Sequence, residues 1–433
     1  MLVNRRNILK LFGTTVLLNF NIPKRALAVV KLPAFIPNRK IKLGLLWSSS
    51  GHLSIIEKPS LDVALFWIQQ VNENGGIAGI QVEPVVVDAK SDIKTYRQGI
   101  QFLMNEARVI ATFGGYTSAS RRAVMPLVAK QNSLFYYPTC YEGRECWQNI
   151  ICTGPIANQH SFDLIPYMVG RYGGRSYFVG SNYVWPIETN RIAKQLLADA
   201  GGDIIGEKYV PLGDGNFGRI IQDIINKKPN WIFSTVVGDS DIYMRQQYLK
   251  SKLNADIIPI ASLTTSELEI KKLGVEFGEG HILCAPYFQS LNNNKNIKFV
   301  DEFLNSKHGY SGVTHYNMEE TYLSFQYFKK SFENLISRKD LLEINANDIL
   351  NASRGLNLTE SESPEGPVSL DKDNLNSWLK PKIGQFNSKG QLNLVWERDQ
   401  QMAPMPYLVY PDRGLCKMDG LHLPNGQIIR NAS

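Results

Sequence analysis

The feature of this 433-residue chain that most constrains its fold is a repeated alternation of short apolar runs with amphipathic runs at helical spacing. In the first part of the chain, strand-like and helical patterns alternate over residues 41–47, 61–71, 82–88, 93–106, 109–113, 118–130 and 134–137. Ser60 stands where the N-cap of the first helix is expected. A strand–helix–strand order predicts parallel strands with helices on both faces of the sheet, so the pattern predicts an α/β fold.

The same alternation restarts after a loop over residues 138–149. Helices are expected over residues 158–171, 187–199, 217–226 and 239–253, and strands over 176–180, 204–210, 231–236, 257–263 and 282–285. Longer helical stretches near 296–307 and 315–335 precede short strands over 368–370, 383–386 and 392–396. The chain therefore predicts two α/β halves of similar size.

Polar and aromatic side chains gather in the loops that follow the predicted strands. Ligands of doubly wound folds bind outside the carboxyl ends of strands, which here are the loops over 48–51, 114–120, 138–145, 181–186 and 236–240. These loops carry hydroxyls, aromatic rings and glycines with few charges, which suits a small, neutral, planar polar ligand. An amino acid would need a carboxylate for its ammonium group, and only Glu142 and Glu145 are nearby in the sequence.

The sequence contains no P-loop, no G-x-S-x-G elbow and no H-E-x-x-H pattern. A G-x-G-x-x-G match over residues 213–218 is interpreted as a loop, because Pro211 interrupts the approach to it and no acid closes the following strand near Thr235. The six histidines have no ligand spacing and the cysteines fit no zinc pattern, so no metal and no cofactor are expected. Cys140 has no recognisable histidine or lysine partner that would make it a hydrolase nucleophile, so no enzyme activity is expected.

Residues 1–28 have the features of an export signal. The basic pair Arg5-Arg6 precedes a modest apolar run over 11–20, and Ala26-Leu27-Ala28 forms an A-x-A cleavage site. The segment resembles a twin-arginine signal, which predicts a periplasmic location. A disordered basic tail or a wrongly assigned gene start is the alternative. No run of 18 apolar residues occurs, so no stable membrane insertion of the mature chain is expected.

Most of the net positive charge belongs to that same segment. The chain has 47 Lys+Arg and 40 Asp+Glu, a formal charge of +7, and five of the basic residues lie within residues 1–28 without any acid. The remaining chain is thus nearly neutral, at +2. No nucleic-acid partner is therefore expected.

The five cysteines, Cys140, Cys146, Cys152, Cys284 and Cys416, cannot all pair within one chain. Because three of them recur every six residues, a bridge from Cys146 to Cys140 or to Cys152 is one alternative in an oxidising compartment. The favoured interpretation is buried, free thiols.

Five segments resemble a known family. They are residues 113–124 (FGGYTSASRRAV), 137–143 (YPTCYEG), 180–186 (GSNYVWP), 234–238 (STVVG) and 261–267 (ASLTTSE). With these segments the chain resembles, over roughly residues 41–410, the type I periplasmic binding proteins of the urea and short-chain amide receptor group. The last two segments are most similar to the amide sensors of amidase operons.

The resemblance implies two Rossmann-like lobes with parallel sheets, joined by a three-crossover hinge. Lobe I is expected over residues 41–155 and 286–372, lobe II over 156–285 and 373–412, and a C-terminal tail over 413–433.

The resemblance also implies the ligand contacts, carried over segment by segment: Tyr116, Ser118, Tyr137, Thr139, the Cys140 backbone, Tyr183, Trp185, Thr235 and Val236. Family members usually have proline or glutamine at the position of Cys140, tyrosine at that of Trp185 and aspartate at that of Asn182. The larger indole and smaller thiol are expected to reshape the pocket.

These features together predict an exported receptor that captures urea, formamide or an acetamide-like ligand and delivers it to the permease subunits of an ABC importer. Two other functions stay open: an amide sensor that regulates an amidase operon, which the export signal opposes, and a type I receptor for branched-chain amino acids, which the lack of an ammonium partner opposes.

Overall fold

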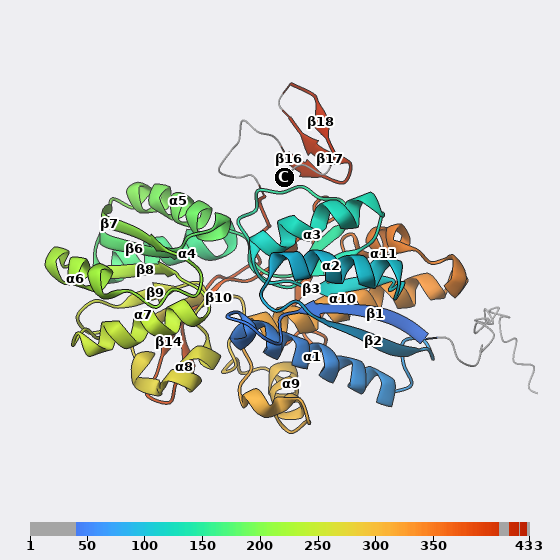
Figure 1. Cartoon of the computed structure of the whole chain (residues 1–433), viewed down its shortest axis with the longest axis horizontal. Helices are drawn as coiled ribbons and strands as arrows, with labels where there is room; N and C mark the ends of the chain where they lie inside the picture. The colour runs from blue at the N-terminus through green and yellow to red at the C-terminus, as the bar shows by residue number, and fades with distance from the viewer. Residues whose placement is uncertain (1–39, 407–414, 424, 431–433) are drawn as a thin grey trace, which may run out of the picture. The chain divides into compact units, whose positions relative to one another are not determined.

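The computed structural model describes residues 40–406, 415–423 and 425–430 (Figure 1). The predicted export signal over residues 1–28 lies outside the described residues. Two large β-sheets, formed by different parts of the described chain, are the framework of the fold.

The first sheet is wholly parallel, in the order β2-β1-β3-β4-β5. Its strands are β1 (Lys40–Trp47), β2 (Gln81–Asp88), β3 (Ala111–Gly114), β4 (Phe135–Tyr137) and β5 (Ile150–Cys152). Helices α1 (Ser54–Glu73), α2 (Ile93–Asn105) and α3 (Ser118–Lys130) connect the first four strands. This part, blue to cyan in Figure 1, confirms the predicted alternation. We call this sheet and the helices packed on it lobe I.

Lobe I also receives a later stretch of chain. It contains α9 (Asn294–Leu304), α10 (Tyr316–Ile336) and α11 (Ala346–Ser353), and the small sheet of β11 (Asn357–Leu358), β12 (Val368–Leu370) and β13 (Ser377–Trp378). The long helix α10 packs against α1 and α11. Its apolar side joins Trp67, Phe113 and Tyr136 in one core, where Phe113 stacks on Phe325 at 4.0 Å.

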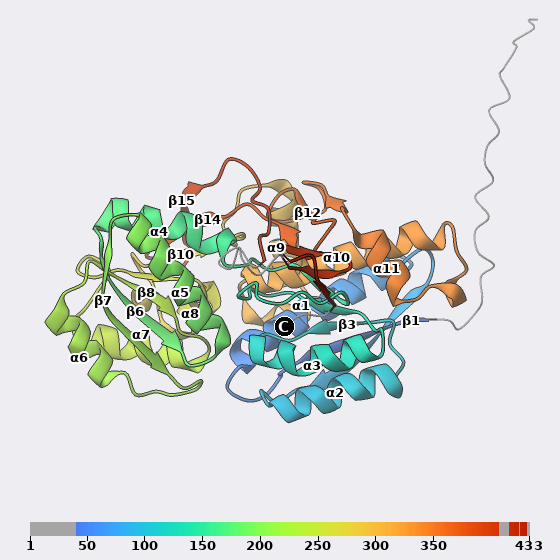
Figure 2. The same cartoon turned by 90° about the horizontal axis from the view of Figure 1, so that it is seen from above.

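The second sheet has seven strands in the order β15-β14-β10-β9-β8-β6-β7. The parallel strands are β6 (Arg175–Ser181), β7 (Asp203–Val210), β8 (Trp231–Thr235), β9 (Ile260–Ser262) and β10 (Ile282–Ala285), and the antiparallel ones β14 (Lys382–Phe386) and β15 (Leu392–Glu397). Its helices are α4 (Asn158–Tyr172), α5 (Val184–Asp199), α6 (Gly218–Lys227), α7 (Asp239–Lys250) and α8 (Glu267–Leu273). We call this unit lobe II; in Figure 2 it is green to yellow, except for the orange-red strands β14 and β15.

The chain passes between the lobes three times, from β5 to α4, from β10 to α9 and from β13 to β14. Hydrogen bonds hold these passages together: the Thr153 hydroxyl donates to the Glu320 carbonyl over 2.8 Å. The buried Lys382 ammonium donates to the Pro286 carbonyl over 2.7 Å. The fold is therefore the predicted one, two α/β lobes joined by three crossovers. The residue boundaries expected for the lobes stay a prediction.

Four helices and strands differ from the sequence predictions. Helix α1 begins at Ser54, so Ser60 lies inside it and does not cap it. Ile55 and Ile56 are buried, and their burial extends the helix towards its amino end past Pro59. Strand β5 and helices α8 and α11 were not expected, because strands of three residues and helices of seven or eight carry too little periodicity to be recognised.

The C-terminal segment is a small antiparallel sheet of β16 (Leu415–Lys417), β17 (Gly420–His422) and β18 (Ile428–Ile429), where only a tail was expected.

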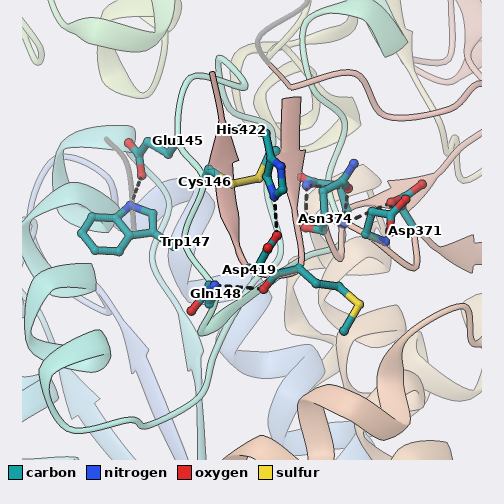
Figure 3. The surroundings of a disulfide bond; sticks show 12 residues. Glu145, Cys146, Trp147, Gln148, Asp371, Asn374, Asp419 and His422 are labelled. Carbon is teal, nitrogen blue, oxygen red and sulfur yellow. Dashed lines mark hydrogen bonds and ion pairs between the residues drawn. A yellow bond between two sulfur atoms is a disulfide. The ribbon is translucent and has the colours of Figure 1, made fainter. Parts of the chain in front are cut away.

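A disulfide joins Cys416 to Cys146, with the two Cα atoms 5.5 Å apart (Figure 3). Both bridges considered from the sequence are thus wrong, because the partner lies 270 positions away. Cys140, Cys152 and Cys284 are free and buried, as the favoured interpretation held for them.

Candidate functional site

Five of the predicted ligand residues come together at the carboxyl ends of the strands. Tyr116 follows β3 and Tyr137 ends β4, with Cys140 three residues on, while Tyr183 precedes α5 and Trp185 lies in its first turn. Tyr116, Tyr137, Cys140 and Trp185 share one continuous apolar cluster that spans both lobes, and Tyr183 packs against it. We call these five residues the cleft cluster.

Four members of the cleft cluster are buried, and Tyr183 is half-buried. Tyr137 is fully buried and Trp185 is only 2% exposed. The Tyr137 hydroxyl donates to the Tyr116 carbonyl over 2.5 Å, and the Tyr183 and Trp185 rings lie 6.5 Å apart. Burial, with Tyr316, Cys140 and Tyr183 nearby, raises the pKa of Tyr116 well above its usual value, so this phenol is neutral.

Ser118 lies beside the cleft cluster but is held in a buried ionic network. Its hydroxyl donates to Glu142 Oε2 over 2.5 Å and accepts from Arg121 Nη1 over 3.0 Å. Arg121 Nη2 lies 3.0 Å from Glu142 Oε1 and 2.8 Å from Glu145 Oε1. Arg122 Nε lies 3.1 Å from the same Glu145 oxygen, so two arginines neutralise the two carboxylates.

Thr235 and Val236 point elsewhere. The Thr235 hydroxyl donates to Asn190 Oδ1 of α5 over 2.8 Å. The Val236 side chain packs in a separate apolar cluster of lobe II, on the side of Val179 and Ile260. In this conformation neither side chain is part of the cleft cluster, and the Val236 carbonyl accepts a hydrogen bond from the Thr264 hydroxyl over 2.7 Å.

Helix α10 contributes a side of the site that sequence reasoning missed. The Tyr316 hydroxyl donates across the lobes to the Thr264 carbonyl over 2.9 Å. Asn317 Oδ1 accepts from the Thr139 hydroxyl over 3.4 Å. Burial, and then the Glu320 carboxyl, raise the pKa of the Cys140 thiol. The only sequence signal was the amphipathic stretch near 315–335, which does not say where its polar residues point.

The protonation state of Cys140 bears on the enzyme question. Its thiol is buried and its pKa is raised, so it is held as the neutral, unreactive form. Nucleophilic chemistry at this sulfur is therefore disfavoured.

Among the residues that the structure describes, no group of three histidine, cysteine, aspartate or glutamate side chains is placed to hold a metal ion.

The lobes also touch where the loop after β1 meets lobe II. Gly238, at φ +64°, has so little room that an added Cβ would lie 3.2 Å from the His52 carbonyl oxygen. Helices α3 and α5, one from each lobe, are in contact as well (Figure 2). With the Tyr316 bond, these contacts define a closed arrangement of the lobes around the cleft cluster.

Two open cavities, of about 610 and 420 Å³, lie away from the cleft cluster. One is lined by the surface of α9, the other by polar side chains of α1, α9 and α10 such as Gln70, Lys298 and Glu333. Neither contains a predicted ligand residue. Within the described part of the chain, no helix has the length and hydrophobicity of a membrane span.

Solved structures with the same fold support the two-lobe description. The chain is similar to a solute-binding protein of an ABC transporter from R. palustris, solved with benzoate, at a TM-score of 0.75 and 17% identity, covering 84% of this chain and 98% of that one. A leucine-binding protein from Thermotoga maritima matches at a TM-score of 0.70 and 14% identity, covering 82% and 98% of the two chains.

A curated relative matches only a part of the chain. A Geobacillus stearothermophilus protein named limonene hydroxylase is 28% identical over 138 residues, which are 31% of this chain. The match spans 23% of that relative's own length. A family model described as a periplasmic binding protein domain matches residues 41–413, nearly all of the described chain. The chain therefore belongs to the periplasmic binding protein family, a family of receptors and not of enzymes.

Proposed function

We propose that this protein is an exported, periplasmic receptor that captures a small neutral amide, such as urea, formamide or acetamide, and delivers it to the permease subunits of an ABC importer. Membership of the periplasmic binding protein family supports the receptor role. The importer is supported by similar structures, which are titled as solute-binding proteins of ABC transporters. The export signal resembles the twin-arginine type.

The observation that carries the amide proposal is the neutrality of the cleft cluster. Its members offer aromatic faces, phenols, a thiol and an indole N–H, and the charges beside it cancel within the network of Arg121, Arg122, Glu142 and Glu145. A small uncharged ligand with a few hydrogen-bonding groups fits such surroundings, because a buried charge without a partner is costly.

Binding proceeds through closure of the lobes. Tyr116, Tyr137 and Cys140 come from lobe I, and Tyr183 and Trp185 from lobe II. A ligand that touches both groups binds the closed state better than the open one and shifts the equilibrium towards it. The permease then meets the closed, loaded form.

An amino-acid receptor is the second candidate, and one observation favours it. The buried carboxyl of Glu320 has no hydrogen-bonding partner within the described part of the chain and could accept an ammonium group. A solved relative in this fold was titled as a branched-chain amino acid receptor in complex with isoleucine. An amide sensor has no comparable support and conflicts with the export signal.

A ligand-induced shift in melting temperature tests the proposal. A ligand that binds only the folded state adds about 2.7 kcal/mol at a hundredfold excess over Kd. We expect shifts with urea, formamide or acetamide and none with leucine, isoleucine or benzoate. A shift with leucine and with no amide contradicts the amide proposal, and release of ammonia from a bound amide contradicts the receptor role.

A further inference from the structure

Helix α10 presents a polar strip to the cleft cluster. Glu320 follows Tyr316 by four residues and Asn317 by three, so it lies on the same side of the helix as both of them. Two contacts place that side against the end of lobe I's strands: Thr139 donates to Asn317, and Thr153 donates to the Glu320 carbonyl. Asn317 therefore contacts the residue before Cys140, and the Glu320 carboxyl, on the same side of α10, is one of the groups that raise the pKa of the Cys140 thiol.

The strip has unused hydrogen-bonding capacity. Among the described residues, both carboxyl oxygens of Glu320 and the amide nitrogen of Asn317 are buried without a partner, and so is the indole nitrogen of Trp185 across the cleft. Native proteins leave few buried polar atoms unpaired, and those that remain call for a partner such as a ligand. The free groups comprise a carboxyl and two N–H donors, which matches a ligand with both N–H and C=O groups.

The surroundings of Glu320 favour its neutral form. Burial and the nearby Glu365 raise the pKa of Glu320 well above its usual value. The other groups around it are Cys140 and Tyr316, which are neutral, and Glu319, whose pKa is also raised by burial. Lys382 interacts with Glu319 and Glu365, and its ammonium donates to the carbonyls of Pro286, Lys380 and Glu365.

A neutral carboxyl group and a primary amide are complementary. The acid presents an O–H donor next to a C=O acceptor, and a primary amide presents a C=O acceptor next to an N–H donor on the same side. The two groups can therefore join by two parallel hydrogen bonds. A fully N-alkylated amide has no N–H and forms only one of them.

We propose that the Glu320 carboxyl recognises the primary amide group of the ligand through this pair of hydrogen bonds, and so selects primary amides and urea. The inference rests on the proposed function and names the residue that gives it specificity. It also gives the Glu320 carboxyl, which has no hydrogen-bonding partner among the described residues, a role other than binding an ammonium group.

The test compares binding of acetamide and N,N-dimethylacetamide by calorimetry. Glu320→Met removes both hydrogen bonds at similar side-chain volume, and we expect about a 5- to 150-fold loss of acetamide affinity. The preference for acetamide over N,N-dimethylacetamide should collapse in the same variant. Glu320→Gln keeps an adjacent donor and acceptor, so it should bind acetamide at least about fivefold better than Glu320→Met does.

The matched control is Glu319→Met, at the neighbouring buried carboxyl of α10 that interacts with Glu365 and is not part of the strip. It should keep the wild-type preference between the two amides. If Glu320→Met does not fold, Glu320→Asp, which withdraws the carboxyl by one methylene, should show the same loss of preference.

The outcomes separate the two proposals. Wild-type protein that binds no amide contradicts the proposed function itself. Wild-type protein that binds acetamide, with affinity and preference unchanged in Glu320→Met, contradicts only the role of Glu320. Equal losses in Glu320→Gln and Glu320→Met, with leucine bound by the wild type, would show a charged carboxylate holding an ammonium group.

Discussion

At the scale of single residues, the aromatic side chains that follow the strands pack together, whereas two of the predicted polar ones bond to other side chains. Tyr116, Tyr137 and Tyr183 come together because parallel strands and the loops after them converge at one edge. The hydrogen-bonding partners of the hydroxyls could not be predicted from local sequence patterns. Ser118 is hydrogen-bonded to Arg121 and Glu142, and Thr235 to Asn190.

Ser118→Ala tests what the ionic network does. The change removes the hydroxyl that links Glu142 to Arg121, so it should lower the free energy of unfolding of the empty protein by about 1–3 kcal/mol. Amide affinity should fall as well, because the network borders the cleft cluster. Denaturant titration and calorimetry measure the two effects, with the exposed Ser337→Ala as a control that should change neither. Loss of affinity without loss of stability would mean that Ser118 binds the ligand directly.

Trp185→Tyr tests what sets the size of the site. Trp185 is 2% exposed and its indole nitrogen has no partner among the described residues, so a smaller ring should open space towards the ligand. We expect affinities in a series from formamide to butyramide to shift towards the longer amides. A lower melting temperature with an unchanged order of affinities would assign Trp185 to the core of lobe II instead.

At the scale of elements, the C-terminal sheet is joined to the loop that carries the ionic network. Cys146 follows Glu145 directly, and Gln148 Nε2 donates to the Met418 carbonyl over 2.9 Å close to the disulfide (Figure 3). The bridge therefore fastens β16–β18 next to Glu142 and Glu145, whose carboxylates hold Arg121.

Cys146→Ser should release this sheet and destabilise the protein by about 2–5 kcal/mol, the usual cost of losing a native disulfide. Mass spectrometry of unreduced protein should find a peptide that links Cys146 to Cys416, with three thiols free to alkylate after unfolding. A linkage from Cys146 to Cys140 or Cys152 would contradict the structure. Cys284→Ser changes a free thiol that belongs to lobe II and not to the disulfide, so it should leave the C-terminal sheet attached.

At the scale of the whole molecule, buried acids should make stability depend on pH. Burial raises the pKa of Glu57, Glu267, Glu269 and Glu365 to about 7 each. In the unfolded chain these groups ionise near their ordinary value, so between that value and about 7 the folded state binds more protons. Its stability therefore falls as pH rises through this window.

The buried histidines act in the opposite direction below their usual pKa. Burial lowers the pKa of His160 and of His315 to about 3, so acidification below about 6.5 protonates them only in the unfolded state. Between about pH 6.5 and 8 the histidine contribution fades and that of the acids dominates, so the free energy of unfolding should fall. Denaturant titrations at both pH values measure this change, and Glu57→Gln should reduce it. Stability that rises over this range would contradict the assignment.

The sequence by itself determined the α/β class, the two mostly parallel sheets and the aromatic character of the strand ends, because strand and helix periodicity and strand-end chemistry are local properties. The tertiary structure alone decided which distant groups meet. Thr139 and Asn317 lie 178 positions apart, and Cys146 and Cys416 lie 270 apart. No local pattern records such proximity, since it follows from the crossover that returns the chain to the first lobe at α9 and α10, and from the disulfide that ties the C-terminal sheet to Cys146. Helix α10 could be predicted, but its packing against Thr139 and Thr153 could not.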